Sequence, residues 1–150
     1  GLYQYHRMTS LYAALFVLTG DARLALAGQI GLAALLAIGL LLASRRGWPA
    51  RHLLAAAVMA STLMSPYGYD YDLPVMGAGI ALLAPDLAAW GRRAWPLLLP
   101  LSWLACFAGI IIKAVYAAPP RPALGIVPVL LLCAALLALA RRPPAGTESR

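Results

Sequence analysis

The stretch SPYGYDYD, residues 65–72, concentrates acidic and aromatic side chains in a chain that has few acids elsewhere. It holds two of the five acidic residues and three tyrosines. Carboxylates and phenols form hydrogen bonds with hydroxyl groups, and a carboxylate can also accept the proton of an attacking hydroxyl. The stretch is therefore a candidate site for a hydroxylated ligand. The candidate substrate-binding residues in it are Asp70, Asp72, Tyr67, Tyr69 and Tyr71.

Each of these residues also has an ordinary structural interpretation. Tyrosine is common where a membrane helix meets water, Asp72 can cap the helix that follows, and Asp70 can be a solvated loop acid. These interpretations leave the density of the cluster unexplained, and acids at a membrane boundary are functional candidates. Because Asp72 has a capping role available, Asp70 is the stronger candidate for ligand contact.

A second polar segment, YQYHRMTS at residues 3–10, precedes the first apolar run. His6 and Arg7 could lie on the same face as residues 65–72, where an arginine near a helix N-terminus would suit a phosphate. Arg7 could equally be an arginine that extends to the membrane surface. We include His6, Arg7 and Ser10 among the candidate substrate-binding residues.

The same segment contains signals for a short helix. Thr9 or Ser10 could cap a helix over residues 11–18, with Gly20 as its end and Asp21 as the cap of the next helix. A helix of this length rises only about 12 Å, too little to cross a bilayer. It is expected to lie along the membrane surface or to be re-entrant.

The rest of the chain has the composition of a membrane protein. It is 63% hydrophobic, its mean hydropathy is +0.80, and its uncharged intervals approach the roughly 20 residues that cross a hydrocarbon core. The sequence predicts an all-α, polytopic transmembrane bundle with about five spans and the short N-terminal helix. The expected spans are about 22–44, 50–66, 72–90, 95–115 and 122–140, of which the third is shortest in uncharged residues.

The distribution of charge predicts the orientation of this bundle. The net charge is +7, and eight of the Arg and Lys residues fall on one face of the predicted bundle, against four on the other. The positive-inside rule places the larger set in the cytoplasm. Residues 1–20 would then be an extracytoplasmic juxtamembrane segment, 21–140 the bundle, and 141–150 a cytoplasmic tail. The 65–72 loop would be extracytoplasmic.

Several kinds of site find no support in the sequence. Zinc, P-loop and dinucleotide motifs are absent, so we expect no metal and no cofactor. Cys106 and Cys133 lie in apolar intervals and are interpreted as small buried hydrophobes. The first residue is not methionine, and the chain is interpreted as the C-terminal part of a longer multipass protein.

Two segments resemble a known family. HRMTSLYAALFVLTG at residues 6–20 and SPYGYDYDLPV at residues 65–75 are similar to the C-terminal half of bacterial glycosyltransferase family 87. These are polytopic enzymes of the GT-C superfamily, described as polyprenol-phosphate-mannose-dependent alpha-mannosyltransferases. The resemblance extends from about Arg7 to Leu83, and beyond Pro85 the match is only to generic membrane helices.

The resemblance implies transfer of a hexose, expected to be mannose, on the extracytoplasmic face of a bacterial inner membrane. The implied partners are a polyprenyl-phosphate-linked sugar donor, a glycan or glycolipid acceptor, the lipid bilayer, and the N-terminal half of the same protein, with no nucleic acid. The principal catalytic acid of such enzymes lies in that N-terminal half. The catalytic residue is therefore unknown here, and the chain alone is expected to be inactive.

Two alternatives remain open from the sequence. A transporter or flippase module would use the acids and Lys113 to line a pathway, although the internal repeat common in transporters is not visible. A non-enzymatic membrane assembly subunit would use the tyrosines as an interfacial belt.

Overall fold

The chain forms a bundle of helices. The computed structural model describes residues 7–69, 72, 74–90, 95–116 and 123–141. Within these residues it is all-helical, as predicted, with no strand and one isolated antiparallel bridge. The helices are α1 (Leu11–Thr19), α2 (Ala22–Arg45), α3 (Ala50–Met64), α4 (Pro74–Trp90), α5 (Trp95–Val115) and α6 (Ile126–Arg141).

Local signals define the first two helices as the sequence predicts. Ser10 is the N-cap of α1, and its hydroxyl accepts a hydrogen bond from the Ala13 N–H at 3.2 Å. Gly20 ends α1 in the left-handed region, at φ 71°, which glycine adopts without steric cost. The Asp21 carboxylate then caps α2 by accepting from the N–H groups of Arg23 and Leu24.

Three helices are shorter than the predicted spans. Helix α3 ends at Met64 rather than at residue 66, because Pro66 forces the preceding Ser65 into an extended conformation. Helix α4 begins at Pro74 rather than at residue 72, with the proline in its first position, where a missing N–H costs least. Helix α6 begins at Ile126 rather than at residue 122, which places Pro128 in its first turn.

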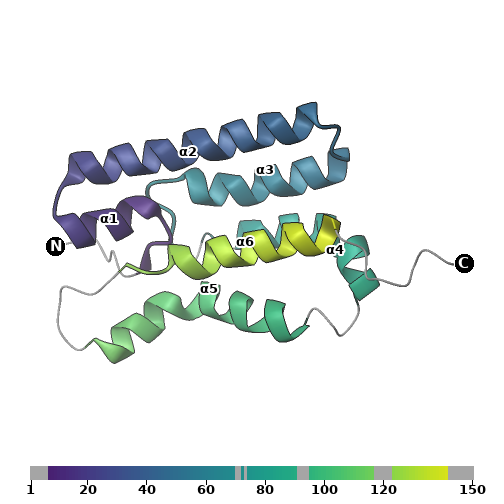
Figure 1. The fold of residues 1–150 in the computed structure, drawn as a ribbon. Helices are drawn as coiled ribbons and strands as arrows, with labels where there is room; N and C mark the ends of the chain where they lie inside the picture. Colours follow the sequence, from purple (N-terminus) through teal and green to yellow (C-terminus); the bar gives the residue numbers. More distant parts are fainter. Residues whose placement is uncertain (1–6, 70–71, 73, 91–94, 117–122, 142–150) are drawn as a thin grey trace, which may run out of the picture.

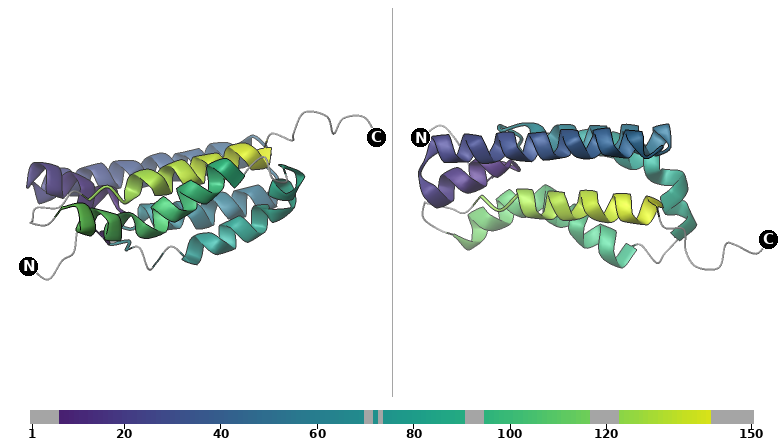
Figure 2. Two further views of the ribbon diagram at one scale, coloured as in Figure 1. Left: turned by 90° about the horizontal axis from the view of Figure 1, so that it is seen from below. Right: turned by 45° about the horizontal axis from the view of Figure 1, so that its top comes forward.

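The long helices lie side by side along one axis, as two views show (Figures 1 and 2). Helix α1 packs on α2, α3 packs on α2 and α4, and α6 packs on α3, α4 and α5. The core between α3, α4 and α6 is formed by side chains including Ala55, Met59, Leu83, Val129 and Leu136. Small residues such as Ala55 let these helices approach closely.

Two helices are long and apolar enough to cross a bilayer, namely α2 and residues Pro96–Val115 of α5. Only 11% and 17% of their apolar windows are buried inside the chain, and large side chains such as Leu35, Ile38 and Trp103 are exposed. Helices α3, α4 and α6 have 15, 17 and 16 residues, a rise of about 23–26 Å against a hydrocarbon core of about 30 Å. Length therefore supports two spans rather than five.

The bundle has two distinct ends (Figure 1). One end, called the α1 end, contains α1, the 65–69 segment and the start of α6. The other, called the arginine end, contains the ends of α2, α4 and α6 and the start of α3. Its described arginines are Arg45, Arg46, Arg51 and Arg141.

Candidate functional site

The structure brings the two polar stretches of the sequence into direct contact at the α1 end. The Thr9 N–H donates to the Gly68 carbonyl at 2.8 Å, and Met8 and Tyr69 form the antiparallel bridge. The segment that precedes α1 therefore lies against the loop that follows α3. The described parts of the two polar stretches therefore meet at the α1 end.

Two glycines allow this close approach. A Cβ on Gly68 would lie 3.3 Å from the Thr62 carbonyl oxygen and 3.4 Å from the Thr9 hydroxyl. A Cβ on Gly125 would lie 3.0 Å from the Met8 carbonyl oxygen. Met8 is fully buried, because it is held between the 68–69 backbone and the start of α6.

Adding a methyl group at Gly68 is expected to open this contact. Gly68→Ala should lower the free energy of unfolding by about 1–3 kcal/mol, because the new methyl group meets a backbone oxygen that cannot move away easily. Thermal unfolding in detergent micelles measures the change. Gly77→Ala is the matched control, since a Cβ there meets nothing within 4 Å, and it should leave stability unchanged or higher. Equal unfolding temperatures for the two variants would contradict the packing argument.

The described tyrosines of the loop have different environments. Tyr67 is 60% exposed, and its ring lies 6.1 Å from that of Tyr12, tilted by 55°. Tyr69 is partly buried and packs with Met8, Ala13 and Ala123. Tyr67 and Tyr12 thus present aromatic surface to a ligand, whereas Tyr69 mainly anchors the loop. The sequence did not suggest Tyr12, although an aromatic residue at the start of an interfacial helix is a usable signal.

Asp72 does not act as the helix cap that the sequence predicted. Its carboxylate accepts a hydrogen bond from the Tyr69 N–H at 2.9 Å, and its own N–H donates to the Tyr69 carbonyl at 3.0 Å. Pro74 begins the following helix and has no N–H to offer a cap. The carboxylate therefore turns back and closes the loop, and Asp72 remains exposed at its end.

Of the other predicted site residues, the structure describes Ser10 and Arg7. The Ser10 side chain is fully buried in its capping role, so it positions α1 rather than contacting a ligand. Arg7 is partly exposed beside the Met8–Tyr69 bridge. His6, Asp70 and Tyr71 lie outside the described residues.

A buried glutamine joins three helices directly behind this site. The Gln29 side-chain oxygen accepts from the Tyr12 N–H at 3.0 Å, and its side-chain nitrogen donates to the carbonyls of Leu63 at 2.9 Å and Met64 at 3.0 Å. Gln29 is 2% exposed. It satisfies backbone groups that the ends of α1 and α3 leave without intrahelical partners. In the sequence, Gln29 could have been noticed as the one polar side chain in the apolar run 24–43.

A second polar cluster lies at the arginine end and joins α3 to α4. One terminal nitrogen of Arg51 donates to both Asp86 oxygens at 2.8 Å, and His52 Nε2 lies 3.0 Å from Asp86 Oδ2. His52 Nδ1 is buried and has no hydrogen-bond partner. The cluster fastens the bundle opposite the candidate site. In the sequence, Asp86 stands out as an acid between two apolar runs. The sequence does not show that Arg51 and His52 are its partners.

The described groups at the α1 end can bind a ligand through hydrogen bonds and charge. No group of three or more His, Cys, Asp or Glu side chains suited to a metal ion occurs among them. The exposed Tyr67 and Asp72 and the partly exposed Arg7 lie near the Met8–Tyr69 bridge in the chain. Phenol, carboxylate and guanidinium groups can hold a hydroxylated or anionic ligand. No family model, curated protein or solved structure matches the chain.

Proposed function

We propose that the chain is part of an integral membrane glycosyltransferase. It transfers a hexose, for which mannose is the leading candidate, from a polyprenyl phosphate donor. The acceptor is a hydroxyl of a glycan or glycolipid on the extracytoplasmic face. The observation that carries the proposal is the contact between residues 8–9 and 68–69. The two segments that resemble family 87 lie far apart in the sequence and form one surface in the folded chain.

The groups at this surface suit a sugar phosphate. Tyr67 and Tyr12 offer rings and phenols to sugar hydroxyls, and Arg7 is a cation close to the same loop. Asp70 and Tyr71 enter the proposal from the sequence alone, since they follow Tyr69 in the segment that resembles family 87. In the reaction, a carboxylate takes the acceptor hydroxyl proton as the oxygen attacks the anomeric carbon, and the phosphate departs with the bonding electrons. The N-terminal half that the resemblance to family 87 implies would supply that carboxylate.

We further propose that the bundle is multipass, with the α1 end outside and the arginine end in the cytoplasm. Support comes from the apolar side chains exposed on α2 and α5. It also comes from the position of four of the six described arginines at the arginine end. The shorter helices α3, α4 and α6 would cross where neighbouring helices shield their ends or where the bilayer thins. This arrangement puts the donor phosphate and the candidate site at the same membrane surface.

The decisive experiment tests the Asp70→Asn variant of the full enzyme, in which this chain is joined to the implied N-terminal half. Transfer of mannose from polyprenyl phosphate mannose should fall about tenfold or more, the value of a hydrogen bond to a charged group. Asp21→Asn is the matched control at the same end of the bundle. Asparagine caps a helix as well as aspartate does, so this variant should retain full transfer.

Other outcomes would favour other functions. Undiminished transfer by the Asp70 variant would remove that residue from the site. Movement of a lipid-linked substrate across reconstituted vesicles, with no glycosyl product, would indicate a flippase. Unchanged function after Tyr67, Tyr69 and Tyr71 are all replaced by Phe would indicate an assembly subunit, because a sugar site would lose its phenolic hydrogen bonds.

A further inference from the structure

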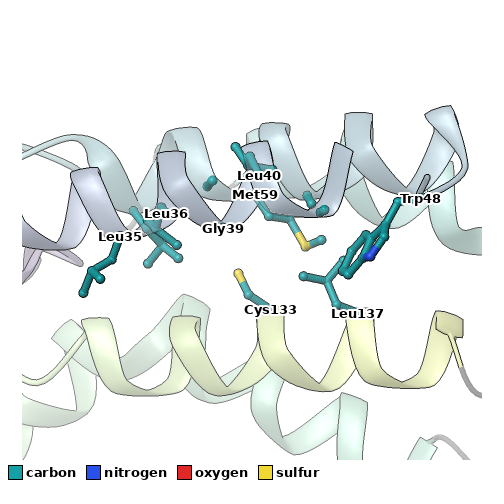
Figure 3. A pocket seen from close by; sticks show the side chains of 12 residues that line it. Leu35, Leu36, Gly39, Leu40, Trp48, Met59, Cys133 and Leu137 are labelled. Atoms are coloured by element: carbon teal, nitrogen blue, oxygen red, sulfur yellow. The ribbon is translucent and has the colours of Figure 1, made fainter. Parts of the chain in front are cut away.

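An apolar groove runs between α2, α3 and α6 toward the arginine end. Its volume is about 250 Å³. Figure 3 shows Cys133 and Leu137 of α6 facing Leu36 of α2 and Met59 of α3 across this space, with Trp48 at one end. Apart from Trp48, the side chains that line the groove carry no nitrogen or oxygen atom. The lining therefore suits a hydrocarbon ligand.

The groove ends beside cationic groups. The Arg141 guanidinium carbon lies 3.9 Å from the centroid of the Trp48 ring, so this arginine contacts an aromatic face rather than a carboxylate. Arg45 and Arg46 form the C-terminus of α2 at the same end and are both exposed. A ligand that lies along the groove would therefore meet positive charge where the apolar lining stops.

We infer that the groove binds one acyl chain of an anionic phospholipid, whose phosphate contacts the arginines Arg45, Arg46 and Arg141. The volume is below the roughly 300–1,000 Å³ of pockets for larger ligands, and a helix about 10–12 Å wide does not fit. A stretch of one hydrocarbon chain matches a groove of this size, and the arginines select a negative headgroup. This inference goes beyond sugar transfer and requires only that the bundle lies in a membrane.

Gly39 offers a direct test, because it lines the groove and a Cβ there meets nothing within 4 Å. Gly39→Leu should fill the space without displacing a neighbour. Gly31→Leu is the matched control on the same helix, since a Cβ there also meets nothing within 4 Å and Gly31 does not line the groove. Both variants should insert into membranes as the wild type does, which resistance to alkaline extraction measures.

The readout is the number of lipids that the purified chain retains in native mass spectrometry. Phosphatidylglycerol and phosphatidylcholine with identical acyl chains are the probes. The wild type and the Gly31 variant should retain one phosphatidylglycerol, and the Gly39 variant should lose it. A double variant, Arg45→Gln with Arg46→Gln, leaves the apolar packing untouched. It should reduce the preference for phosphatidylglycerol about tenfold or more.

Three results would overturn the inference. The Gly39 variant could retain as much phosphatidylglycerol as the Gly31 variant, which would place the lipid elsewhere. Equal retention of the two lipids by the wild type would exclude recognition of the headgroup charge. A wild-type dimer without bound lipid that Gly39→Leu dissociates would show that a second copy of the chain occupies the groove. None of these results depends on mannosyl transfer.

Discussion

Replacing Gln29 with methionine is expected to lower the free energy of unfolding by about 2–4 kcal/mol. Methionine has nearly the same length and flexibility, so the change removes three hydrogen bonds and little packing. It leaves the Tyr12 N–H and the Leu63 and Met64 carbonyls without their partner. Because these groups are enclosed by the bundle, water cannot replace the lost bonds.

Chemical unfolding in mixed micelles, followed by circular dichroism, measures this loss. Leu26→Met is the control, since Leu26 is on the same helix and exposed, and a volume-conserving swap there should cost less than about 1.5 kcal/mol. Equal stability of the two variants would show that Gln29 contributes packing only. The proposed function adds a second expectation: loss of Gln29 should reduce hexose transfer, because Tyr12 and α1 would no longer be fixed to the end of α3.

Replacing Asp86 with leucine is expected to destabilise the bundle by about 1–3 kcal/mol. The estimate is below that for a fully buried pair, because the Asp86 side chain is 22% exposed and that of Arg51 is 41% exposed. The variant leaves Arg51 without its carboxylate and His52 with neither ring nitrogen hydrogen-bonded. The junction between α3 and α4 at the arginine end should loosen.

A double variant separates the ion pair from side-chain packing. Arg51→Leu together with Asp86→Leu should be more stable than the sum of the two single changes predicts, because it leaves no uncompensated charge between Arg51 and Asp86. The same unfolding measurement provides all three values. Additive losses would mean that the pair contributes no coupling and that the cluster stabilises the bundle through shape alone.

Much of the helical structure follows from short-range signals. Ser10 and Gly20 define the two ends of α1, and Asp21 defines the start of α2, through contacts only two to four residues apart. Prolines place the remaining boundaries within a few residues. Helices α3, α4 and α6 differ from the expected spans at residues 66, 72 and 122, because prolines lie near those ends of the uncharged intervals.

The candidate site was predictable in location but not in detail. Both polar stretches adjoin helix ends on one face, so their proximity follows from the order of the helices. The different roles of the two tyrosines do not follow from the sequence. Tyr67 and Tyr69 have the same side chain and differ only in what packs against them. Aspartate is likewise a residue type that commonly caps helices. The direction of the Asp72 carboxylate nevertheless depends on the turn around Tyr69.

By itself, the sequence determined the all-helical fold, the ends of α1, the start of α2, and the arginines that border the apolar runs. These properties depend on apolar run length, capping and charge, which are encoded within one or two helical turns. Only the tertiary structure decided that Gln29 joins α1 to α3, that Asp86 pairs with Arg51 and His52, and that Met8 is enclosed by Gly68 and Gly125. Those contacts join residues far apart in the chain, and helix packing selects each partner from many that the sequence permits equally.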